Sequence, residues 1–324
     1  MDVLHSAVSI MTPLLFAATG GLFTELAGLL NIALEGMILA GAFAAIIGAH
    51  VTGSLWAGTF AGILAGLVLA GLLGFFTLRL RSNVFITGLA ANLFASGLTV
   101  VLSHRFFGTR GVLALGNIPR LPALHIPGLP RLPVLSNHSG YVYVSWLLLV
   151  LAWVALYRTP FGFRLRACSR GADALVSLGL KPDSYRFCGF LLSGCACGIG
   201  GAYLALNLGV FVPNMSSGKG WIALVVIFLG GRHPAGLFVA AFMFGLAEAF
   251  SNYAQGSFNI PADFILAIPY IFTLFVMAGF SIFSSSFSTR KIFSSFPFSS
   301  FFPFFSKIFS KLKTKFFSLF SFLR

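Results

Sequence analysis

Two carboxylates and an amide, Glu25, Glu35 and Asn31, lie in the mostly apolar stretch between Gly20 and Gly41. An ionisable group at membrane depth costs roughly 3 kcal/mol on insertion scales, so such groups face a bundle interior or an aqueous path. Asn31 and Glu35 are four residues apart, which places both on one face of a helix. We expect a helix, a break at about Glu25–Leu30, and a second helix whose first turn presents Asn31 and Glu35 together. The alternative is a short interfacial loop in which the acids contact only water.

Carboxylates and amides also recur in other apolar parts of the chain. The wider polar set consists of Glu25, Asn31, Glu35, Asn83, Asn92, Asn207, Asn214, Glu248 and Asn252. Amides offer both donors and acceptors, so the set suits recognition of a neutral solute that is rich in hydrogen-bonding groups. A proton-coupled carrier would also use buried acids. A single acid such as Glu248 can equally be a structural partner of a neighbouring helix.

The sequence lacks the common motifs of catalysis and phosphate binding. There is no GxxxxGK[ST], HExxH or GxSxG, and the SSGKG segment at Ser216–Gly220 is too short for a phosphate-binding loop. The four cysteines lack a zinc-like C-x-x-C spacing and are predicted to be packing residues; they are Cys168, Cys188, Cys195 and Cys197. We therefore predict a protein that is not an enzyme and that has no metal or cofactor site.

The composition of the chain is that of a membrane protein, so membrane-spanning segments must position these polar groups. Hydrophobic residues make up 58% of the chain and charged residues 9%, with a mean hydropathy of +0.95, whereas soluble domains are about 25% charged. The apolar runs are Val3–Phe23, Asn31–Ala49, Leu55–Leu78, Val84–Leu102, Tyr141–Tyr157, Phe187–Leu208, Trp221–Gly230, Ala235–Tyr253 and Phe264–Phe280. The seventh is too short to span, which predicts a discontinuous or re-entrant helix. The expected fold is an all-α polytopic membrane protein of about nine transmembrane helices, within a range of eight to ten.

Basic residues indicate the sidedness of the chain. Its net charge is +14, and many of the basic residues fall in short loops, which is the positive-inside pattern rather than a nucleic-acid footprint. Arg79, Arg81 and the segment Arg158–Arg186 should be cytoplasmic, so the loop Ser103–Gly140 and the N-terminus lie outside. We expect a membrane domain over 1–280. The Phe/Ser/Lys-rich tail at 281–324 should be cytoplasmic, either as an amphipathic helix on the membrane surface or without fixed structure.

The third apolar run carries a small residue at every fourth position: Gly58, Gly62, Gly66, Ala70 and Gly74. Small residues at this spacing let two helix backbones approach closely in a membrane. The alternative, a flexible glycine-rich linker, conflicts with the Leu, Val and Ile residues that fill the positions between them. The run therefore predicts a tight helix-packing seam.

Four stretches between Gly20 and Gly279 carry a resemblance to a known family. They are GGLFTELAGLLNIALEGMILAGAF at Gly20–Phe43, RTPFGFRLRACSRGADALVSLGL at Arg158–Leu180, GKGWIALVVIF at Gly218–Phe228 and FGLAEA at Phe244–Ala249. The sequence resembles the permease subunits of ATP-binding-cassette (ABC) importers for nucleosides and simple sugars, of the branched-chain-type permease superfamily. The most specific segment is NIALEGM, at Asn31–Met37.

The resemblance implies an all-helical bundle that pairs with a second homologous permease, each on a cytoplasmic ABC ATPase and served by an extracytoplasmic substrate-binding lipoprotein. It assigns Arg158–Arg186 to ATPase contact, in which Asp173, Ala174 and Leu175, followed by Gly179, resemble a degraded EAA-x3-G coupling loop. Two stretches depart from the family pattern. RACSRGADAL at Arg166–Leu175 stands where relatives read RAVGENPRAA, and GGRHP at Gly230–Pro234 stands where relatives often carry an aromatic residue and an Asn before the Pro.

Residues and resemblance together lead to one functional expectation. The chain is a multi-pass permease subunit of a bacterial inner-membrane importer, with Asn31, Glu35, Glu25 and Asn92 lining the substrate path. The expected solute is a nucleoside, with riboflavin or a simple sugar as the alternative. A stand-alone channel or ion-coupled carrier is the competing class, and a membrane-embedded transferase is a third.

Overall fold

The computed structural model describes residues 2–116, 118–119, 121–124 and 137–257. The helices are α1 (Asp2–Leu26), α2 (Leu34–Thr52), α3 (Leu55–Gly74), the π-helical turn η1 (Phe75–Arg79), α4 (Val84–Phe107), α5 (Gly140–Arg158), α6 (Pro160–Arg170), α7 (Ala172–Ser177), α8 (Pro182–Leu208), α9 (Lys219–Leu229) and α10 (Pro234–Ser257). Two short antiparallel strands, β1 (Ala123–Leu124) and β2 (His138–Ser139), pair with each other.

Within these residues, seven helices are long and apolar enough to cross a membrane, namely α1, α2, α3 with η1, α4, α5, α8 and α10. They coincide with seven of the nine apolar runs. The seventh run forms α9, which has only eleven residues. The ninth run and the tail at 281–324 lie outside the described residues, as does the whole second unit, Leu274–Arg324. The structure confirms an all-α membrane protein but not the count of nine.

Local signals explain several helix ends. The Asn83 side chain caps α4 by accepting a hydrogen bond from the Phe85 N–H at 2.8 Å. Pro182 occupies the first position of α8, where its missing N–H costs nothing. At the other ends, Gly108 after α4 and Gly209 after α8 have φ of +68° and +69°. Glycine adopts this left-handed backbone without steric cost, so it stops the helix.

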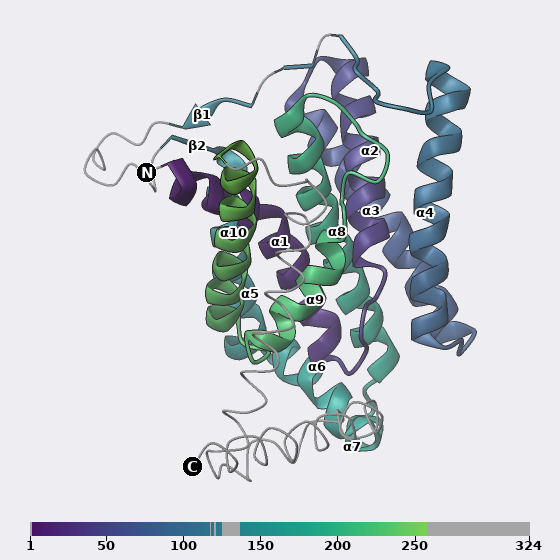
Figure 1. Cartoon of the computed structure of the whole chain (residues 1–324). Helices are drawn as coiled ribbons and strands as arrows, with labels where there is room; N and C mark the ends of the chain where they lie inside the picture. Colours follow the sequence, from purple (N-terminus) through teal and green to yellow (C-terminus); the bar gives the residue numbers. More distant parts are fainter. Residues whose placement is uncertain (1, 117, 120, 125–136, 258–324) are drawn as a thin grey trace, which may run out of the picture. The chain divides into compact units, whose positions relative to one another are not determined.

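Helix α1 lies at the centre of the described bundle and packs against α5, α8, α9 and α10 (Figure 1). Its side chains Met11, Leu14, Leu15 and Phe16 have no exposed surface. By contrast, α3 and α4 carry exposed apolar side chains such as Trp56, Phe60 and Leu93. Apolar side chains of this kind are typical of a surface that meets lipid.

The predicted glycine seam on α3 packs against α2 at Gly58 and against α8 at Gly66. A Cβ added at Gly66 would lie 2.2 Å from the Gly194 carbonyl oxygen, and one added at Gly198 would lie 2.5 Å from the Gly62 carbonyl oxygen. Both distances are far below van der Waals contact, so the two backbones touch directly. The small-residue pattern therefore predicted this interface correctly, and α8 supplies the matching glycines.

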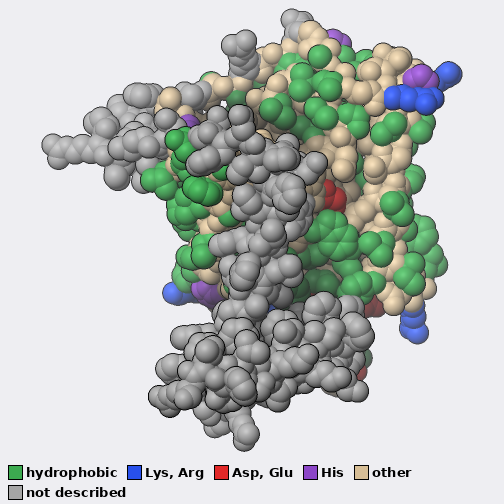
Figure 2. All heavy atoms as spheres, viewed as in Figure 1, with side chains coloured by type: hydrophobic (Ala, Val, Ile, Leu, Met, Phe, Trp, Pro, Cys, Tyr) green, Lys and Arg blue, Asp and Glu red, His purple; other side chains and the backbone are tan. Residues whose placement is uncertain are grey.

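The two ends of the bundle differ. The short helices α6 and α7 lie at one end, whereas β1, β2 and the beginning of α1 lie at the opposite end (Figure 1). Figure 2 shows Lys and Arg side chains near both ends, separated by mostly apolar and uncharged surface. Helix α9 covers about 16 Å, or half of a bilayer's hydrocarbon core of roughly 30 Å, and irregular backbone connects it to α8.

The break between α1 and α2 differs from the expectation. Helix α1 continues through Glu25 to Leu26, and α2 begins only at Leu34, so Asn31 lies in the break rather than in a helical turn with Glu35. The cause is local: the Asn31 Oδ1 accepts the Ala33 N–H at 3.0 Å. An asparagine that bonds the backbone two residues ahead forms a turn that competes with the helix.

Candidate functional site

Asn31 and Asn92 hold the break between α1 and α2. Asn31 is 1% exposed, and its amide donates to the Ser193 Oγ on α8 at 2.9 Å. Asn92, on α4, accepts from the Gly36 N–H at 2.7 Å and donates to the Ile32 carbonyl at 2.9 Å. The two Asn92 bonds satisfy backbone groups that the break would otherwise leave unpaired, which is costly at membrane depth.

Glu35 fixes the beginning of the half-length helix α9. Its Oε1 accepts from the Gly218 N–H at 2.8 Å and its Oε2 from the Gly220 N–H at 2.6 Å. A carboxylate at a helix N-terminus satisfies free N–H groups and complements the helix dipole. Gly220 permits this approach, because a Cβ there would lie 2.3 Å from the Glu35 nitrogen. The two acceptor bonds therefore tie the first turn of α2 to the first turn of α9.

Two ion pairs lie near the two ends of α9. Lys219, its first residue, pairs with Glu248 of α10 at 2.7 Å. Arg232, three residues after its end, pairs with Glu25 near the end of α1, also at 2.7 Å. With Glu35, three carboxylates from α1, α2 and α10 thus hold this helix in place.

Aromatic contacts connect the far end of α9 to α6. The Tyr157 hydroxyl donates to the Arg232 carbonyl at 3.4 Å, and its ring lies 5.2 Å from the His233 ring. The Arg166 guanidinium of α6 stacks over the same Tyr157 ring at 4.7 Å. Gly28 in the break also touches α6, because a Cβ there would lie 3.0 Å from the Ser169 Cα. Helix α6 thus contacts both the break and the residues that follow α9.

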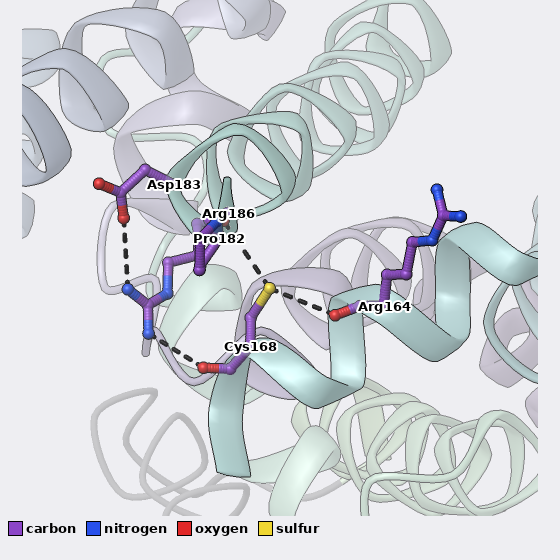
Figure 3. A network of polar contacts seen from close by, with 5 residues as sticks. All are labelled: Arg164, Cys168, Pro182, Asp183 and Arg186. Carbon is purple, nitrogen blue, oxygen red and sulfur yellow. Dashed lines mark hydrogen bonds and ion pairs between the residues drawn. The ribbon is translucent and has the colours of Figure 1, made fainter. Parts of the chain in front are cut away.

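A polar network fastens α6 to the start of α8 (Figure 3). The Arg186 guanidinium pairs with Asp183 at 3.3 Å and donates to the Cys168 carbonyl at 3.0 Å. The Cys168 Sγ lies 3.2 Å from the Arg164 carbonyl oxygen and 3.7 Å from that of Pro182. The short helix α6 is therefore held to α8 by side-chain contacts as well as by chain connectivity.

Burial raises the pKa of the Cys168 thiol, and the nearby Arg186 charge opposes this only in part. The neutral thiol is thus favoured in the folded state. Its contribution to stability is present below the unfolded pKa of about 8.5 and is lost as the pH rises through the higher folded value. We expect alkylation of Cys168 by iodoacetamide at pH 8.5 to be at least about tenfold slower in folded than in urea-unfolded protein, as followed by peptide mass. Equal rates would contradict the buried position.

The four residues that resemble a coupling loop lie on and after α7. Asp173 and Ala174 are exposed, whereas Leu175 is 5% exposed and anchors the helix. Gly179 has a φ of +75° and donates to the Val176 carbonyl at 2.9 Å. Two apolar side chains beside them, Val176 and Leu178, are 60% and 75% exposed.

The geometry groups the predicted path residues in an unexpected way. Asn31, Asn92 and Glu35 hold the break and the start of α9, whereas Glu25 lies at the other end of α9. Their assignment to the substrate path stays a prediction. Sequence reasoning missed Lys219 and Arg232, whose acidic partners are 29 and more than 200 residues away in the chain. The only available signal was the presence of two basic residues beside a run too short to span.

Comparisons with known proteins agree with this description. The family model described as branched-chain amino acid transport system / permease component matches residues 3–307. The nucleoside ABC transporter permease protein NupC of Lactococcus lactis is 31% identical in an alignment of 284 positions that covers 83% of this chain and 89% of that protein. The guanosine ABC transporter permease protein NupQ of Bacillus subtilis is 32% identical in an alignment of 286 positions that covers 83% of this chain and 88% of that protein.

A solved structure shares the fold. It is described as a metal-chelate type ABC transporter in an inward-facing conformation, and it aligns with a TM-score of 0.50 at 17% identity over 86% of this chain and 85% of that chain. At this identity the likeness concerns the helical arrangement alone.

Proposed function

We propose a nucleoside as the solute of this chain, which belongs to the branched-chain amino acid transport system / permease component family and is the permease subunit of an ABC importer. It is a multi-pass protein of the bacterial inner membrane and, as a transport subunit, is not an enzyme. The observation that carries the choice of solute is the similarity to NupC and NupQ over four fifths of the chain. The amides and carboxylates of the bundle provide suitable chemistry for a neutral, hydrogen-bonding solute.

The proposed assembly places a cytoplasmic ATPase against α6 and α7. Exposed Val176 and Leu178 support this, because exposed apolar side chains at the end of a short helix suit a protein contact. Contacts from α6 to Tyr157 and to the break offer a route by which movement of the ATPase reaches α9. A second homologous permease completes the path, and an extracytoplasmic lipoprotein delivers the solute at the end where α1 begins. In this orientation Asn31, Asn92, Glu35 and Glu25 shape the wall of the path.

Uptake of labelled guanosine by cells that express the complete importer tests the proposal. We expect uptake to need the ATPase and to persist with a protonophore when ATP is held constant, because the importer draws on ATP rather than on a proton gradient. Excess unlabelled uridine should compete, whereas riboflavin and glucose should not. Uptake that is abolished by the protonophore but independent of the ATPase would instead indicate an ion-coupled carrier. Competition by glucose or riboflavin, without competition by uridine, would show that the solute is that compound rather than a nucleoside.

A further inference from the structure

One face of α10 changes from apolar to polar side chains along the length of the helix. Leu237, Ala241, Phe244, Glu248 and Asn252 follow one another at spacings of three or four residues, so they share this face. The first two have no exposed surface and Phe244 is 1% exposed. The Glu248 side chain is 23% exposed and Asn252 is exposed. The face is thus apolar and covered in the first part of the helix. In the second part it is polar, with Ser251 buried, Glu248 partly exposed and Asn252 exposed.

The change occurs where α9 begins. Helix α9 packs against α10, and its first residue, Lys219, is the ion-pair partner of Glu248. Past this point the chain leads into the irregular segment between α8 and α9, in which Asn214 and Ser217 are exposed. Because α9 is only half as long as a spanning helix and begins beside Glu248, it does not extend along the second half of α10, where Asn252 is exposed.

The opposite face of α10 is the one suited to lipid. Val239 and Phe250 are each 58% exposed and Met243 is 40% exposed. Phe250 is two residues from both Glu248 and Asn252, about 200° around the helix from each. Charged and amide side chains in a spanning helix face a water-filled path or a protein partner rather than lipid. The Glu248 face is therefore directed to the interior of the transporter.

The Lys219–Glu248 pair retains capacity for hydrogen bonding. The bond between them joins the Lys219 Nζ to the Glu248 Oε1. A carboxylate has a second acceptor oxygen and an ammonium has two further donors. Both side chains keep exposed surface, 13% for Lys219 and 23% for Glu248. A nucleobase edge, which shows an N–H donor next to a carbonyl or ring-nitrogen acceptor, matches this acceptor and donor pair.

We infer that Lys219 and Glu248 form a base-recognition site in the path, with Asn252 one turn farther along α10. Glu248 accepts from the N–H of the base and Lys219 donates to the adjacent acceptor. The inference rests on the proposed nucleoside transport and names two residues that would bind the base of the transported nucleoside. It differs from the sequence-based prediction of the substrate-path residues. The polar side-chain atoms of Asn31, Asn92 and Glu35 already form the hydrogen bonds that position the break and α9.

Uptake kinetics of Glu248→Gln in the complete importer provide the first test. We expect the KM for guanosine to rise at least about tenfold, the size of one charge-assisted hydrogen bond, at an unchanged amount of permease in the membrane. Asp183→Asn is the matched control: it also removes a paired carboxylate, but from an exposed ion pair near the start of α8, and its KM should equal that of the wild type. A KM for Glu248→Gln within twofold of the wild type would overturn the site.

The charge-swapped variant Lys219→Glu with Glu248→Lys separates recognition from a structural role. A purely structural pair would regain both membrane level and KM when its charges are exchanged. We expect the swapped variant to reach the wild-type membrane level, whereas its KM stays at least about tenfold raised because donor and acceptor have changed places. Full recovery of the KM would refute the inference.

Chemical accessibility keeps the inference testable if the charge variants fail to fold. Asn252→Cys should react with a charged, membrane-impermeant thiosulfonate, and saturating guanosine should slow this reaction at least about fivefold, as measured by peptide mass. Phe250→Cys, at the same depth on the opposite face, should stay unmodified. Reaction at Asn252→Cys without protection by guanosine would contradict the proposed base-recognition site. If the wild-type importer takes up no nucleoside, the proposed function itself is wrong. Failure of the base-recognition site and failure of the proposed function are therefore distinguishable.

Discussion

Replacing Gly198 by leucine is expected to remove nearly all folded permease from the membrane. Gly198 lies where α8 crosses α3, and an added Cβ alone would come within 2.5 Å of the Gly62 carbonyl and 2.8 Å of the Ile63 Cα. Both neighbours are backbone atoms, so the clash is relieved only if the helices separate. Separation would also open the contacts around Gly66 and Gly194, where the backbones meet one turn away.

The expected cost is more than about 3 kcal/mol, because overpacking by a few methylenes costs 1–3 kcal/mol even where side chains can yield. This is a large part of the total stability of a folded domain, about 5–15 kcal/mol. Membrane level and the monodisperse fraction after detergent extraction are the measurements. Gly97→Leu is the control, since Gly97 lies within α4 and a Cβ there meets nothing within 4 Å. Equal levels of the two variants would show that α3 and α8 are not closely packed.

This interface illustrates which parts of the fold the sequence predicts well. The spacing of Gly58, Gly62 and Gly66 is a local pattern, and it led directly to a close helix contact, as hydropathy led to the spanning helices. The partner helix was not predictable from the same pattern. Gly194 and Gly198 on α8 are small residues among several others on that helix, and only the three-dimensional arrangement pairs them with α3.

The polar residues show the opposite situation. Glu25, Asn31, Glu35 and Asn92 were identifiable because polar groups are costly in an apolar environment, but their partners are a distant arginine, a serine and backbone amides. Periodicity carries no information about such long-range pairs. Asn31 was also assigned to a helical turn, since helix spacing does not reveal that its side chain bonds the backbone two residues ahead. Sequence reasoning thus identified these polar residues but not the contacts that they make, and their assignment to the substrate path stays a prediction.

Replacing Glu35 by glutamine is expected to lower the maximal rate of guanosine uptake about 10- to 100-fold and to leave its KM within twofold of the wild type. The Glu35 carboxylate accepts two N–H groups at the start of α9, at 2.8 and 2.6 Å. A carboxamide oxygen accepts only on one side, and its NH₂ group faces the second N–H. The variant thus loses a charge-assisted bond of about 1.5–3 kcal/mol and leaves a backbone donor unsatisfied.

The same substitution should lower the thermal unfolding temperature of the purified importer, because α9 would lose the anchor at its N-terminus. Asn83→Ala is the matched control: it also removes a side-chain oxygen from a helix N-terminus, but the capped helix is α4 and Asn83 is exposed. Its cost should be about 1 kcal/mol, with uptake within twofold of the wild type. Whether Glu35→Gln changes the maximal rate or the KM of uptake decides between a positioning role and contact with the solute. If Glu35→Gln raised the KM as much as Glu248→Gln, then Glu35 would contact the solute and would not serve mainly to position α9.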